Sequence, residues 1–299
     1  MTDVWRAKLE AGGVVLIEGG TGSELRRRGV ALDARAWSGP AALSRPDTLT
    51  AIHSDYIRAG ADVITTNTFG TTRFVLEAAG LGERFESINR ASVDAARRAC
   101  EIAGRPVAIA GSISCLPPGF DPTRYPDASA ERAAYAELAS LLAELGVDLL
   151  VLEMMEDTVH APRACEAVRG VGLPFWLGVS ARTGARGLVA YDFAQIPFGD
   201  VLDALLGYAP AVVNIMHTPP ETVGPALAML AEKWSGPAGA YPEVTGDSPA
   251  RLAGWAGGWL RAGACVLGGC CGTTPEHVSA LRRLIEQRGK DGGGGRPEG

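Results

Sequence analysis

The chain has 299 residues, of which 46% are hydrophobic and 21% charged, as in globular enzymes and unlike disordered proteins. Asp and Glu outnumber Lys and Arg by 34 to 28, and the net charge of −6 argues against a nucleic-acid-binding surface, which needs clustered cations. No apolar run approaches the roughly 18 residues of a membrane span, and the first 13 residues lack the apolar stretch of a signal peptide. We therefore expect a soluble, cytoplasmic protein without nucleic-acid or membrane partners.

Short apolar segments alternate with amphipathic segments along the whole chain. The apolar segments predict strands at 14–20, 62–68, 106–113, 148–154, 174–181, 211–217, 237–243 and 264–270. Their near-continuous apolar character is typical of strands buried on both faces, as in a parallel sheet. One amphipathic segment places Leu49, Ile52 and Tyr56 on one face, with Pro46 near its start and Gly60 after its end, which predicts a capped helix.

Eight strand–helix units in a chain of this length predict an α/β protein with a (β/α)8 barrel, the TIM-barrel architecture. The alternative is an open, doubly wound sheet, but the sequence has neither of the glycine-rich phosphate loops that such sheets usually carry. We assign residues 1–289 to a single barrel domain. Residues 290–299 include four consecutive glycines and no large apolar side chain, which predicts a disordered tail.

Unusual residues stand at the carboxyl ends of the predicted strands, where barrel enzymes place their active sites. They are Glu18, Gly19 and Gly20 after the first strand, Glu153 at the fourth, His217 at the sixth, and Cys270 and Cys271 at the eighth. Unpaired carboxylates at the ends of buried strands cost several kcal/mol. A substrate ammonium group would compensate Glu18 and Glu153, and the alternative is an internal salt bridge to Arg26 or Arg73.

The adjacent pair Cys270 and Cys271 lies between glycines that free the backbone, so both thiols can turn toward one point. Three interpretations are open: a strained disulfide, two inert buried thiols, or ligation of a soft metal. A catalytic zinc needs three protein ligands and an open position. His217 is the best candidate for the third ligand, because it alone among the histidines ends a predicted strand.

The other cysteines and histidines predict less specific roles. Cys100, Cys165 and Cys265 fall in apolar elements, where cysteine usually behaves as a small hydrophobic residue. Cys115 lies in a polar loop and is ambiguous. We expect the remaining histidines to be surface or helix-capping residues, and these are His53, His160 and His277.

Four stretches of the chain resemble the homocysteine S-methyltransferase family: residues 18–25, 56–69, 88–90 and 268–275, the last reading Gly-Gly-Cys-Cys-Gly-Thr-Thr-Pro. The resemblance extends from about residue 14 to 288. It implies a (β/α)8 barrel with zinc at Cys270 and Cys271 and a third ligand at the end of the sixth strand. It also implies that Glu18 and Glu153, with the glycines after residue 18, hold the amino group of the substrate.

The chain departs from the family pattern at three places. The family usually has Asp where this chain has Glu18, Thr where it has Met154, and a ligating Cys where it has Ile215. Alignment on the following Thr-Pro-Pro instead puts His217 at the ligand position. Residues two apart in a strand face the same side, which makes this shift plausible.

The resemblance implies a zinc-dependent S-methyltransferase that moves a methyl group from a sulfonium or ammonium donor to the thiolate of homocysteine or a related thiol or selenol. The partners would then be a small-molecule thiol acceptor and a methyl donor. One alternative is a zinc-binding barrel that binds a thiol without methyl transfer, and another is an acceptor subunit that works with a separate corrinoid protein. A metallohydrolase is disfavoured because the His-x-His pattern after the first strand is absent.

Overall fold

The computed structural model describes residues 3–115 and 121–292. Its main sheet has eight parallel strands in the order β1-β10-β9-β8-β5-β4-β3-β2, and a parallel bridge between Ile17 and Val63 joins the two outer strands. The strands are β1 (Val15–Leu16), β2 (Val63–Thr65), β3 (Ala108–Ser114), β4 (Leu149–Met155), β5 (Phe175–Val179), β8 (Val212–Met216), β9 (Ala238–Tyr241) and β10 (Val266–Leu267). All eight predicted strands are confirmed, and so is the (β/α)8 barrel.

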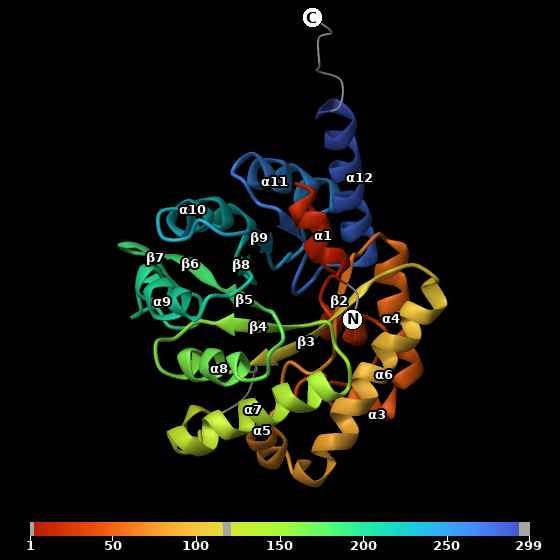
Figure 1. The fold of residues 1–299 in the computed structure, drawn as a ribbon, viewed down its shortest axis with the longest axis vertical. Helices are drawn as coiled ribbons and strands as arrows, with labels where there is room; N and C mark the ends of the chain where they lie inside the picture. The colour runs from red at the N-terminus through yellow and green to blue at the C-terminus, as the bar shows by residue number, and fades with distance from the viewer. Residues whose placement is uncertain (1–2, 116–120, 293–299) are drawn as a thin grey trace, which may run out of the picture.

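Helices surround the strands, and at least one follows each barrel strand (Figure 1). They are α1 (Val4–Glu10), α2 (Thr21–Arg27), α3 (Ala41–Ser44), α4 (Pro46–Arg58), α5 (Arg73–Ala78), α6 (Phe85–Ala103), α7 (Ala128–Glu144), α8 (His160–Arg169), α9 (Phe198–Leu205), α10 (Pro220–Ala231), α11 (Pro249–Arg261) and α12 (Pro275–Gly292). Helix α4 begins at the predicted proline and ends just before Gly60, whose φ of 109° suits glycine.

Alternate residues of each strand face the barrel interior and the helices. Along β5, Trp176 belongs to the inner apolar cluster, whereas Leu177 and Val179 belong to the larger cluster between strands and helices. Similarly, Val212 and Met216 of β8 face inward. Burial of both faces accounts for the near-continuous apolar runs of the strand sequences.

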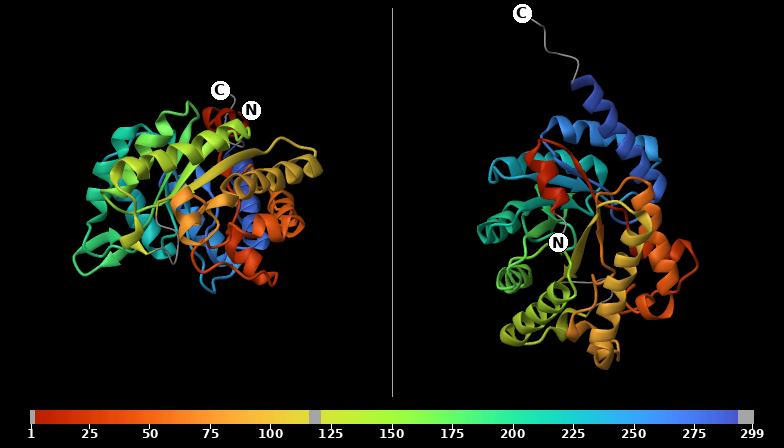
Figure 2. Two further views of the ribbon diagram at one scale, coloured as in Figure 1. Left: turned by 90° about the horizontal axis from the view of Figure 1, so that it is seen from below. Right: turned by 45° about the vertical axis from the view of Figure 1, so that its right-hand side comes forward.

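Helix α1, which the sequence analysis did not predict, lies at one end of the barrel (Figure 2). Its Trp5 is 2% exposed and packs edge-on against Trp176 of β5, with ring centroids 5.3 Å apart. On the same helix, Lys8 donates a hydrogen bond to Asp62 just before β2, at 2.7 Å. Since Trp176 faces the interior, α1 closes the barrel from the end opposite the carboxyl ends of the strands.

An antiparallel hairpin of β6 (Ala181–Gly184) and β7 (Gly187–Ala190) interrupts the connection from β5 to α9. It too was missed, because its polar, glycine-rich sequence resembles a loop more than a buried strand. The hairpin starts at the carboxyl end of β5 and returns the chain to that end at Tyr191, whose N–H donates to the carbonyl of Ser180 at 3.3 Å. It therefore adds side chains to the rim on which the functional residues are predicted.

Helix α12 continues to Gly292, so the first three residues of the predicted tail are helical, and residues 293–299 lie outside the described residues. The domain boundary at residue 289 stays a prediction. Among the described helices, none combines the length and the apolar character needed to cross a membrane.

We predict that Trp5→Ala lowers the free energy of unfolding by about 3–5 kcal/mol, because it removes a buried aromatic side chain and leaves a cavity against Trp176. Urea denaturation followed by circular dichroism measures this. Ile102→Ala, at a side chain that is 66% exposed, is the control and should change stability by less than about 0.5 kcal/mol. Equal midpoints for the two variants would show that α1 does not stabilise the barrel.

Candidate metal centre and adjoining pocket

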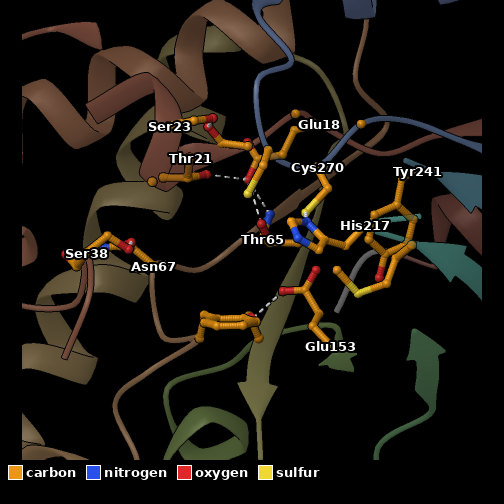
Figure 3. A pocket seen from close by; sticks show the side chains of 18 of the residues that line it. Glu18, Thr21, Ser23, Ser38, Thr65, Asn67, Glu153, His217, Tyr241 and Cys270 are labelled. Atoms are coloured by element: carbon orange, nitrogen blue, oxygen red, sulfur yellow. Dashed lines mark hydrogen bonds between the residues drawn. The ribbon is translucent and has the colours of Figure 1, made fainter. Parts of the chain in front are cut away.

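The structure brings together His217, Cys270 and Cys271. Their potential ligand atoms all lie within 4.8 Å of one another, and no other such group of three occurs among the His, Cys, Asp and Glu residues that the structure describes. Nδ1 of His217 is 3.4 Å from Sγ of Cys270 (Figure 3). His217 directly follows β8 and the cysteines follow β10, so the carboxyl ends of two strands supply the cluster.

The chain segment that leaves β9 lies between the two segments that carry these residues. The N–H of His217 donates to the carbonyl of Tyr241 at 3.1 Å, and the N–H of Cys270 donates to the carbonyl of Pro242 at 2.8 Å. Consecutive residues of one segment thus hold both strand ends that carry the cluster. The spacing between imidazole and thiols is therefore set by backbone hydrogen bonds.

The cysteine loop depends on the glycine after it. Gly272 has φ 79°, and a Cβ there would lie 2.0 Å from the carbonyl oxygen of Val244. The N–H of Val244 in turn donates to the carbonyl of Cys271 at 2.7 Å. A side chain at position 272 would therefore separate the cysteine loop from the segment that orders it.

His217 reaches the cluster by an unexpected backbone conformation. Ile215 packs in the outer cluster between strands and helices, and Met216 faces the barrel interior. Regular alternation would turn His217 outward beside Ile215, so the same-side rule for residues two apart in a strand does not explain how His217 reaches the site. The φ of His217 is +46°, a conformation that costs a non-glycine residue about 1–3 kcal/mol. This left-handed turn directs the imidazole toward the thiols.

Backbone strain is concentrated around one cavity. Non-glycine residues with positive φ include Met154 (56°) and Trp37 (51°) besides His217, and all three line it. The cavity opens to solvent, and the space in it that water can occupy measures about 120 Å³. Every residue that the sequence analysis assigned to the site also lines it: Glu18, Gly19, Gly20, Glu153, His217, Cys270 and Cys271.

The carboxylate of Glu18 is bound by the protein itself. One oxygen accepts hydrogen bonds from the N–H and hydroxyl of Thr65 at 2.7 and 2.8 Å, and from Thr21 at 3.4 Å (Figure 3). The other oxygen lies 3.0 Å from Nδ1 of His53 on α4, and both side chains are almost completely buried. The expectation that His53 is a surface or capping residue is therefore wrong.

Neither arginine that was considered as an internal partner reaches these carboxylates. Arg73 pairs with Glu137 on α7, and the Arg26 guanidinium lies over the ring of Trp37, 5.0 Å from its centroid. The alternative of an internal salt bridge to Arg26 or Arg73 is therefore wrong. For Glu18, His53 takes the place that an arginine was expected to fill.

The carboxylate of Glu153 has fewer described hydrogen bonds than that of Glu18. Its described hydrogen bond comes from the hydroxyl of Ser112 at 2.5 Å. Burial, together with the charge of Glu18, raises the pKa of Glu153 to about 7, although interactions with the hydroxyls of Ser112 and Tyr241 favour the ionised form. A carboxyl poised near neutrality with few partners can accept hydrogen bonds from a cationic ligand, so Glu153 is better suited than Glu18 to that task.

His217 stands between the thiols and a third carboxylate. Its Nε2 is 3.8 Å from Glu243, which follows β9. Burial opposes protonation of His217, but the hydrogen bond and charge of Cys271 and the charge of Glu243 raise its pKa overall. The sequence analysis did not select Glu243 or Tyr191, since no motif marks either residue.

The contacts and burial of the remaining histidines and cysteines indicate structural roles. His277 caps α12 through Thr274 and the carbonyl of Asp247, as expected. His160 contacts the buried carboxylate of Glu131 at 2.9 Å. All six cysteines are free thiols, and Cys115 is fully buried.

The raised pKa of Glu153 predicts a pH-dependent stability. Between its ordinary value of 4.5 and about 7, the folded protein keeps a proton that the unfolded chain releases, so the free energy of unfolding falls as pH rises through this window. One pKa unit corresponds to about 1.4 kcal/mol, which limits the loss to about 3 kcal/mol. We expect Glu153→Gln to remove it, as measured by urea denaturation at both ends of the window.

The exposed Glu232→Gln serves as the matched control and should follow the wild type at every pH. Parallel curves for Glu153→Gln and the wild type would contradict the raised pKa.

Known proteins are similar to this chain in sequence and in fold. The sequence profile of the homocysteine S-methyltransferase family matches residues 15–285. A selenocysteine Se-methyltransferase of Brassica oleracea var. italica is 28% identical, and homocysteine S-methyltransferase 3 of Zea mays is 25% identical, each over 93% of this chain and 91% of its own. The metallated homocysteine methyltransferase MmuM of Escherichia coli is 26% identical, with a TM-score of 0.78 over 93% of this chain and 98% of that one. The chain belongs to the homocysteine S-methyltransferase family.

Proposed function

We propose that this family member is a zinc-dependent enzyme that transfers a methyl group from a sulfonium or ammonium donor to the thiolate of homocysteine or a related thiol or selenol. The observation that carries the proposal is the meeting of His217, Cys270 and Cys271 at one cavity. Glu153, lining the same cavity, supplies a carboxyl for the amino group of such an acceptor.

The three side chains fit zinc. Two thiolates and one imidazole are a known catalytic zinc set, and soft sulfur donors disfavour magnesium and calcium, which prefer oxygen ligands. Three protein ligands also leave one position for a substrate. A zinc ion held by His217, Cys270 and Cys271 would lower the pKa of a substrate thiol, which is about 8.5 in water, and so provide a thiolate at neutral pH.

The protein's own residues would then orient the acceptor. An ammonium group beside Glu153 favours the ionised carboxylate and places the acceptor's sulfur toward the thiol cluster. Gly20 permits a close approach, because a Cβ there would lie 2.5 Å from the carbonyl oxygen of Cys270. The carboxylate of Glu18, predicted to share in amino-group binding, also ties the end of β1 to Thr65 of β2.

The methyl transfer balances without a general base on the protein. The acceptor sulfur or selenium forms a bond to the methyl carbon while the bond from that carbon to the donor's sulfur or nitrogen breaks. The electron pair of the broken bond stays with the donor, which leaves as a neutral sulfide or amine. The side chains therefore need only to bind, orient and exclude water.

The test is metal analysis combined with methyl-transfer assays on the zinc-loaded protein. The relatives are named for homocysteine and selenocysteine, so both are offered as acceptors, with S-methylmethionine, S-adenosylmethionine and betaine as donors. Stoichiometric zinc and turnover with one pair support the proposal. Zinc with thiol binding but no turnover would favour the altered barrel, and turnover only with a methylated corrinoid protein would favour the acceptor subunit.

We predict that Cys270→Ser and Cys271→Ser each weaken zinc binding by more than about 100-fold and abolish turnover, because even outer-shell partners are worth about 10- to 100-fold. Chelator competition measures the affinity. Cys265→Ser, directly before β10, is the matched control: its thiol donates to the carbonyl of Ala238 at 3.3 Å, which a serine hydroxyl can also do. Equal zinc affinity in the three variants would remove the cysteine pair from the site.

A further inference from the structure

We propose that Glu243, held in place by Tyr191, is the outer-shell partner of His217. In this arrangement Nδ1 of His217 faces the metal position, and the carboxylate of Glu243 faces Nε2, 3.8 Å away, on the other side of the ring. Glu243 and Tyr191 are thus positioning residues that act through His217. This inference rests on the proposed zinc site and deepens it.

The two ring nitrogens of His217 face different groups. Nδ1 is 3.4 Å from Sγ of Cys270, whereas Nε2 is 3.8 Å from a carboxylate oxygen of Glu243. The imidazole therefore spans the gap between the thiols and the carboxylate. A metal-binding histidine commonly directs its second nitrogen to a carboxylate, which fixes the tautomer and raises the basicity of the ligating nitrogen.

Tyr191 holds both members of the pair. Its hydroxyl donates to one oxygen of Glu243 at 2.7 Å and so leaves the other oxygen toward His217. Its ring packs against the imidazole at a centroid distance of 4.8 Å and an angle of 62°. The side chains of His217 and Glu243 are only 16% and 20% exposed, so solvent screens their interaction weakly.

Backbone hydrogen bonds fix the position of Glu243 relative to His217. Glu243 lies in the segment whose carbonyls, at Tyr241 and Pro242, accept hydrogen bonds from His217 and Cys270. Hydrogen bonds on both sides therefore hold this segment between the two ligand-bearing strand ends.

Hairpin β6–β7 supplies the third member, because Tyr191 immediately follows β7. Another carboxyl group, Glu156, accepts the N–H of Asp192 at 2.7 Å with one oxygen, and its charge also acts on His217. Among the described ion pairs of His217, however, only Glu243 is within 4 Å of a ring nitrogen. Glu243 is therefore the carboxylate that the described contacts assign to the ring.

The carboxylate of Glu243 also compensates for the smaller negative charge of a site with one imidazole in place of a thiolate. Two thiolates and a neutral imidazole carry one negative charge fewer than three thiolates, so a His217 site alone would make a bound thiolate less electron-rich. A carboxylate beside the far nitrogen raises the basicity of the nitrogen that faces the metal position. His217 and Glu243 together can thus take the place of a third thiolate.

The test measures zinc affinity by chelator competition in four proteins: wild type, Glu243→Gln, His217→Cys, and the double variant. We expect Glu243→Gln to weaken zinc binding by about 10- to 100-fold in the wild-type background. In the His217→Cys background the same change should not weaken it, because no imidazole remains to be oriented. Tyr191→Phe, which keeps the ring but releases Glu243, should weaken binding by a smaller factor, and Glu232→Gln is the exposed control.

Several outcomes would overturn the inference. Equal weakening by Glu243→Gln in both backgrounds would show a merely structural role, and so would wild-type affinity in both Glu243→Gln and Tyr191→Phe. If Glu243→Gln fails to fold, the effect of Tyr191→Phe on zinc affinity is compared instead between the wild-type and His217→Cys backgrounds. Tight zinc binding that is insensitive to these variants would leave the proposed function intact, whereas a wild type without zinc affinity would remove the cofactor and the inference together.

Discussion

The functional end of this barrel depends on backbone hydrogen bonds among three neighbouring strand ends. The segment after β9 accepts from the N–H groups of His217 and Cys270, so the imidazole and the thiols are placed by the sheet rather than by flexible loops. Parallel strands end at the same edge of a barrel, which explains how residues more than fifty positions apart come to share one centre. The left-handed φ of His217 is tolerated because the hydrogen bond from its N–H to the carbonyl of Tyr241 holds the residue.

Buried carboxyl groups around the cavity divide into two kinds, which suggests a division of tasks. Glu18 is bound by Thr65 and His53 and fixes the end of β1, whereas Glu153 has Ser112 as its described donor and a pKa raised to about 7 by burial. A carboxylate that is already bound by the protein costs little to keep ionised, but it offers little to a ligand. A carboxyl that is underbound gains most when a cation arrives, and substrate binding thus offsets the cost of its burial.

The barrel was predictable because strand and helix periodicities are strong along the whole chain, and the strand ends pointed to the site. Elements without such patterns were missed: hairpin β6–β7 is polar and glycine-rich, and α1 is only 7 residues long. His53 could have been found, because it shares the helical face of Leu49, Ile52 and Tyr56, which is the buried face of α4. Glu243 and Tyr191 could not, since their importance arises from contacts between segments far apart in sequence.

The position of His217 shows how one change in ligand type requires others. Ile215 occupies the place of the family's usual cysteine but faces the helices, and a residue two positions later would face them too if the strand continued. The imidazole enters the cavity only because the strand ends at Met216 and the next residue adopts positive φ. Once there, its second nitrogen is turned toward the segment after β9, where a carboxylate lies within 3.8 Å. The histidine proposed as a ligand at this position, its left-handed turn and the acidic residue after β9 therefore form one structural unit, and we expect a change in any one of them to weaken the contribution of the other two.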